Sequence, residues 1–157
     1  QPFPTAASTG AAPRMARLGG TQIDEDAATL NLGPDFHDVR CLLNSEVAII
    51  LEHKLEASNK KNVMPVSNFL KAYEYVNRVK QFKTKEVVAQ IRADLEKQPF
   101  HEFEVAQLGN LCPEDADEAK ALVPSLALPN IDGQPRDIDS ASLTEVLQQI
   151  CDSRQFD

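Results

Sequence analysis

One short stretch of the chain has the pattern of a β-strand, and no second stretch shares it. From Ala27 to Gly33 the apolar Leu30 and Leu32 alternate with polar residues, which suits a half-buried strand. A single strand cannot satisfy its own backbone hydrogen-bonding groups. Two interpretations follow: the segment adds to an exposed sheet edge of another protein, or it is an extended loop packed on this chain's own helices.

The residues after this segment have helical periodicity, so the sequence predicts the all-α class. A long first helix is expected to start at 33–35, with Pro34 in its first turn. Apolar residues cover more than half of its girth, which is typical of a helix that is central to the domain or shared with a partner. Its main apolar face consists of Phe36, Val39, Leu43, Val47 and Ile50.

Shorter helices follow, separated by proline and glycine. We expect the second helix to begin at Pro65 or Ser67, the third after Thr84 and the fourth near His101. A fifth helix should have Pro113 in its first turn, and a last one should begin after Ser140 or Ser142. Three regions are predicted: a disordered tail at 1–22, a strand and long helix at 23–66, and a helical domain at 67–157.

The charge distribution limits the classes of partner. The 157 residues carry a net charge of -8, which argues against a general binder of duplex DNA. The stretch 60–97 is nevertheless basic, which indicates either a local contact with single-stranded RNA or an ordinary solvated helical face. The candidate RNA-contacting residues are Lys71, Arg78, Lys80, Lys83, Lys85 and Arg92.

The sequence shows no pattern that indicates catalysis. Its three cysteines form no Cys-x-x-Cys pair, which is typical of a reducing compartment. Cys112 precedes a predicted helix and is a candidate thiol nucleophile, but the acidic residues after it disfavour the thiolate. The simpler interpretation is a small half-buried residue at a helix boundary. We therefore predict no catalytic residue, no metal, no cofactor and no membrane span.

Two longer motifs resemble a known family. CLLNSEVAIILEH at 41–53 and LGNLCPEDADEAKALVPSL at 108–126 are similar to the fourth subunit of eukaryotic RNA polymerase II. NRVKQFKTKEVVAQIRADL at 77–95 fits the family's basic pair of helices, and the resemblance extends from about residue 23 to the C-terminus. The family also has an archaeal counterpart. The segment Thr5 to Gly20 and the loop Ala127 to Ser140 depart from the family pattern.

The resemblance implies a non-catalytic subunit with an HRDC-like helical bundle. It implies pairing with the polymerase's seventh subunit in a stalk beside the RNA exit channel, with roles in initiation and in contacts with nascent RNA and regulatory factors. It also implies a nuclear location and leaves room for the cytoplasm. Related stalk subunits of other nuclear polymerases remain the alternative. Carried over, the residues facing the partner are Leu30, Leu32, Phe36, Leu43 and Val47.

Overall fold

The computed structural model describes residues 25–36, 39–129, 135–136 and 138–156, so the predicted tail at 1–22 lies outside the described residues. Within them every regular element is helical, which confirms the all-α prediction. The α-helices are α1 (Asn44–Lys60), α2 (Ser67–Val79), α3 (Lys85–Glu96), α4 (Glu102–Leu111), α5 (Ala116–Leu122) and α6 (Ser140–Phe156). Short 3₁₀ turns are η1 (Ala27–Thr29), η2 (Pro34–Phe36) and η3 (Pro124–Ala127).

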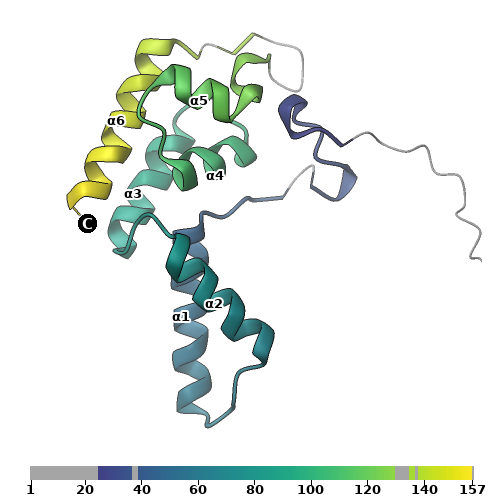
Figure 1. Ribbon diagram of the computed structural model, residues 1–157, viewed down its shortest axis with the longest axis vertical. Coiled ribbons are helices and arrows are strands. Elements are labelled where there is room, and N and C mark those ends of the chain that lie inside the picture. The colour runs from purple at the N-terminus through teal and green to yellow at the C-terminus, as the bar shows by residue number, and fades with distance from the viewer. Residues whose placement is uncertain (1–24, 37–38, 130–134, 137, 157) are drawn as a thin grey trace, which may run out of the picture.

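The helices form a bundle and a projecting arm. Helices α3 to α6 pack together, while α1 and α2 form an antiparallel hairpin that extends away from them (Figure 1). We call this hairpin, residues 44–79, the arm. The predicted boundary between 66 and 67 falls between the two helices of the arm. None of the described helices is both long enough and apolar enough to cross a bilayer.

The hydrophobic core lies almost entirely in the bundle. Helices α3 and α6 contribute most of the large aliphatic side chains, and α4 and α5 close the core from the other side. The buried set comprises Leu43, Phe82, Val88, Ile91, Leu95, Val105, Leu108, Cys112, Ala116, Ala119, Val123, Leu126, Leu143, Val146, Leu147 and Ile150. Only Leu43 in this set precedes the arm.

Aspartates set the starts of the last two α-helices. Asp115 accepts a hydrogen bond from the backbone N–H of Glu118 at 2.8 Å, so α5 begins after it. The sequence predicted Pro113 in the first turn of this helix, and this was wrong: Pro113 is buried in the turn that precedes the helix. Asp139 accepts from the N–H of Ser142 at 3.2 Å and is the side chain that caps α6.

The predicted strand at Ala27 to Gly33 is not formed in this chain. Its first residues are the 3₁₀ turn η1, and Asp26 and Asn31 exchange two backbone hydrogen bonds of 2.9 and 3.0 Å. Leu30 closes the turn in the left-handed region at φ 59°. The segment satisfies its own backbone by bending, because none of the described residues offers it a neighbouring strand.

The long first helix begins later than predicted. Pro34 lies in the 3₁₀ turn η2, and α1 starts only at Asn44. Residues 39–43 are not helical, and side chains from the bundle bond to the backbone there: Glu102 accepts from the N–H of Cys41 at 3.3 Å, and Asn110 accepts from the N–H of Asn44 at 2.8 Å. These contacts outweigh the helical periodicity, because they use backbone N–H groups that a longer α1 would need for its own hydrogen bonds.

Candidate partner-binding surface

The arm lacks a buried core of its own over most of its length. Ala48 near the base of α1 and Val76 near the end of α2 are buried, and no residue from Ile49 to Tyr75 is. Two helices that touch only each other leave one side of each exposed. A stable helix usually gains its stability from packing an apolar face, so this part of the arm has an incomplete set of contacts.

The tip of the arm carries a cluster of exposed apolar side chains. Met64 is 90% exposed and Val66 is 72% exposed, both in the connection between α1 and α2. We call the tip cluster the set Val63, Met64, Val66 and Leu70, which lie in the connection and in the first turn of α2. Single exposed apolar residues are ordinary, but a contiguous group of them marks an interaction site.

The base of the arm is fixed to the bundle by Arg92 of α3. Its guanidinium donates to the carbonyl of Cys41 at 2.6 Å, to Glu96 at 2.6 Å and to Glu102 at 2.5 Å. Glu46 of α1 lies 3.6 Å away. Burial lowers the pKa of Arg92, but the bonded carboxylates outweigh burial and raise it, so the side chain stays charged. Arg92 of α3 therefore links α4 to the chain just before α1, and its ion pair with Glu46 reaches the first turn of the arm.

The predicted partner-facing residues differ in how exposed their side chains are. Phe36 is 57% exposed, and Leu30, Leu32 and Val47 are half-buried. Leu43 is fully buried in the bundle core, so it is not available to a partner. The prediction for Leu43 was wrong because α1 starts only at the residue after it, and the extended chain before the helix turns Leu43 inward.

The predicted RNA-contacting residues also divide into two groups. Arg92 is buried and bonded to carboxylates, so this prediction is corrected. The other predicted residues are exposed or half-buried: Lys71, Arg78, Lys80, Lys83 and Lys85. On α2, the guanidinium of Arg78 lies 5.8 Å from the ring centre of Tyr75. Lys71, Glu74, Tyr75 and Arg78 line a shallow hollow of about 400 Å³.

The thiol of Cys112 is poorly suited to act as a catalytic nucleophile at neutral pH. The side chain is buried at the end of α4, and burial raises its pKa to about 11 although Arg154 acts in the opposite direction. A thiol with this pKa is almost entirely protonated at neutral pH. Within the described ranges, no group of three or more His, Cys, Asp or Glu side chains could hold a metal ion.

The chain matches characterised proteins over most of its length. The family model described as RNA polymerase Rpb4 matches residues 41–151, which span the arm and the bundle. DNA-directed RNA polymerase II subunit 4 of Arabidopsis thaliana is 42% identical over 107 residues, covering 66% of this chain and 78% of the relative. Subunit rpb4 of Dictyostelium discoideum is 33% identical, covering 90% and 97% of the two chains.

A third relative gives the same result. DNA-directed RNA polymerase II subunit rpb4 of Schizosaccharomyces pombe is 38% identical over 136 residues, covering 85% of this chain and 94% of its own. The region that the family model matches, 41–151, includes the buried core, the Arg92 contacts and the arm with its exposed tip. Together the family match and these three relatives show that the chain belongs to the RNA polymerase Rpb4 family.

Proposed function

We propose that this chain is a non-catalytic subunit of nuclear RNA polymerase II, which pairs with the seventh subunit to form a stalk near the RNA exit channel. The names of the relatives support the polymerase II assignment. The single observation that carries the heterodimer is the arm, where no residue from Ile49 to Tyr75 is buried. Such an arm is completed by another protein's surface.

The tip cluster is the proposed centre of the interface. Complete burial of one Val, Leu or Met side chain contributes about 1.5–3 kcal/mol. Met64 and Val66 are largely exposed in the isolated chain, so nearly all of that contribution is available to a partner. The hydrogen bond from Asn44 to Asn110 and the ion pair of Glu46 with Arg92 hold the base of the arm, which reduces the entropy lost when the tip docks.

The N-terminal segment forms the second part of the proposed interface. In the isolated chain Leu30 has a left-handed backbone, which costs a non-glycine residue about 1–2 kcal/mol. Extension into a strand on the partner's sheet releases this cost and replaces the hydrogen bonds within the turn by hydrogen bonds to the neighbouring strand. Leu30 and Leu32, both half-buried now, are proposed to face the partner in that state.

The test is coexpression with the seventh subunit of the same polymerase, followed by thermal melting of each protein alone and together. We expect a joint stabilisation that grows with concentration. Val66→Asp at the tip should weaken the affinity about tenfold or more without lowering the melting temperature of the isolated chain. Leu122→Asp is the matched control, because Leu122 is a 49% exposed apolar residue on the bundle.

The outcomes separate the proposals. Equal losses from Val66→Asp and Leu122→Asp would show that the arm is not the interface. Loss of the joint stabilisation on Leu32→Asp supports the strand, and no effect removes it while leaving the arm in place. Two melts that remain unchanged on mixing would contradict the heterodimer. Copurification with the largest subunit of a different nuclear polymerase would support the alternative stalk assignment.

A second function, contact with single-stranded RNA, is favoured by the exposed face of α2. Lys71 and Arg78 flank Tyr75, which combines phosphate-binding charges with a ring on which a base can stack. Binding of a labelled oligoribonucleotide, followed by fluorescence anisotropy, should weaken as salt rises and weaken further in Lys71→Glu and Tyr75→Ala. Lys120→Glu makes the same charge change on α5 and should have little effect. Affinity that ignores salt would end this proposal.

A further inference from the structure

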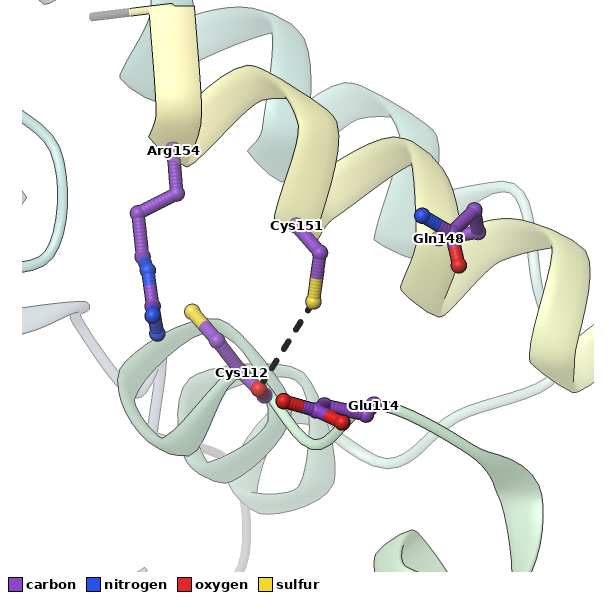
Figure 2. Close-up of a pocket in the computed structure, with 5 residues that line it drawn as sticks. All are labelled: Cys112, Glu114, Gln148, Cys151 and Arg154. Carbon is purple, nitrogen blue, oxygen red and sulfur yellow. Dashed lines mark hydrogen bonds between the residues drawn. The ribbon is translucent and has the colours of Figure 1, made fainter.

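Two of the three cysteines lie together at a pocket whose lining residues are all outside the arm. Cys112 ends α4, and Cys151 lies on α6, 39 residues later in the chain. The thiol of Cys151 donates to the carbonyl oxygens of Cys112 at 3.8 Å and Pro113 at 3.7 Å. Figure 2 shows both sulfur atoms on the side of the pocket between α6 and the turn after α4.

The pocket makes this pair accessible to a small reagent. It has a volume of about 270 Å³ and is lined by Cys112, Glu114, Gln148, Cys151 and Arg154. Cys151 is half-buried, while Cys112 is buried behind it and donates weakly to the carbonyl of Gly109 at 3.5 Å. A thiol is a weak donor, so little is lost when either sulfur turns away from its present acceptor.

We propose that Cys112 and Cys151 form a reversible disulfide that covalently joins α6 to the turn between α4 and α5. The oxidant is a small disulfide such as oxidised glutathione. The thiolate of Cys151 attacks one sulfur of the reagent, and the other leaves as a thiolate. The thiolate of Cys112 then attacks the sulfur of Cys151 and expels the second glutathione. Two protein thiol protons end on two glutathione molecules, so two electrons pass to the reagent.

The order of the two steps follows from exposure. Cys151 meets the reagent first because it is the more exposed of the two. Burial, and then the carboxylates of Glu114, Asp152 and Glu118, raise the pKa of Cys151, while Arg154 of the same helix lowers it. Both thiols are therefore mostly protonated at neutral pH, and the exchange accelerates in mildly alkaline solution.

The third cysteine provides an internal control. Cys41 lies before α1, where its backbone is bonded to Arg92 and Glu102, and it does not line the pocket. Trypsin places the three cysteines on separate peptides: residues 41–54, 98–120 and 137–154. A cross-link between the last two peptides is thus a direct readout of the proposed bond.

The experiment equilibrates the full chain with reduced and oxidised glutathione at pH 8, quenches it with acid, and maps the peptides without reduction. We expect a cross-link of 98–120 to 137–154 that is reversed by excess reduced glutathione. It should be absent in Cys112→Ser and Cys151→Ser and unchanged in Cys41→Ser. Closing a loop of this length should also raise the melting temperature of the oxidised chain by about 10 °C.

Two results would overturn the proposal. One is glutathione attached to Cys151 with no cross-link, even at the most oxidising ratio. The other is a native protein in which Cys41 is found in cross-links as often as Cys112. Such equal participation is expected only of the urea-unfolded chain, which serves as the reference. Neither result bears on the heterodimer, since none of the residues that line the pocket belongs to the arm.

Discussion

Leu43 allows the packing of the bundle to be tested without any partner. It is fully buried, and a Cβ atom built on Gly109 of α4 would lie 2.5 Å from Cδ2 and 3.1 Å from Cγ of Leu43. The two residues therefore share one space, in which the leucine fills the volume that the glycine leaves. Removing the leucine and adding a methyl group at the glycine should compensate each other.

The magnitudes follow from this geometry. Leu43→Ala removes buried atoms and leaves a cavity, which should cost about 3 kcal/mol of the free energy of unfolding. Gly109→Ala gains about 1 kcal/mol of helix propensity but introduces a clash of about 2 kcal/mol, so its net cost is about 1 kcal/mol. In the double variant the clash disappears and the propensity gain remains. The expected cost is about 2 kcal/mol, where independent effects would give about 4 kcal/mol.

Urea unfolding of the isolated chain and its three variants measures this cycle. A coupling of about 2 kcal/mol supports the packing of Leu43 on Gly109. A cost below about 1 kcal/mol for Leu43→Ala in the isolated chain would refute it and return Leu43 to the partner interface. Additive effects in the double variant would show that the two positions do not share space.

Three further predictions concern charged and titrating groups. Arg136→Met should cost about 3–5 kcal/mol in urea unfolding, because it leaves the fully buried Glu104 without the guanidinium 2.6 Å away, and an unchanged midpoint would contradict this. The hydrogen bond from Arg92 lowers the pKa of Glu96 from its ordinary value of 4.5, so the stability it contributes is present above that pH and is lost as the pH falls below it. Glu96→Gln should flatten this acid dependence of the urea midpoint, and an unchanged slope would argue against the bond. Alkylation of Cys112 by iodoacetamide, followed by peptide mass, should be slow at pH 8 and rise toward pH 11, since burial raises its pKa to about 11; rapid labelling at pH 8 would show an open site.

Local sequence patterns were sufficient for most of the helices. The starts of α2 and α3 follow from polar residues before an apolar face, and α4 lies where its apolar residues predicted it. The sequence also shows the apolar excess of the arm, because α1 has more apolar positions than α2 can cover. The pattern does not show which of those apolar residues are buried by other helices of the same chain.

The failures have a common physical cause, which is tertiary contact between distant residues. The start of α1 is displaced because Glu102 and Asn110, about 60 residues away, bond to the backbone before it. Arg92 resembled a surface cation because its carbonyl partner at Cys41 is 51 positions distant, although Glu96 at i+4 was a local signal of pairing. The segment 27–33 forms a turn because strand formation needs a neighbour that none of the described residues supplies, and its pairing with a partner's sheet stays a prediction.

Amide hydrogen exchange of this chain, alone and with the seventh subunit, tests the central claim most directly. In the isolated chain the amides of residues 49–75 should exchange much faster than those of α3 and α6, because no side chain in that part of the arm is buried. On complex formation their exchange should slow markedly, while the bundle changes little. Protection of the arm equal to that of the bundle in the isolated chain, and unchanged by the partner, would contradict the account.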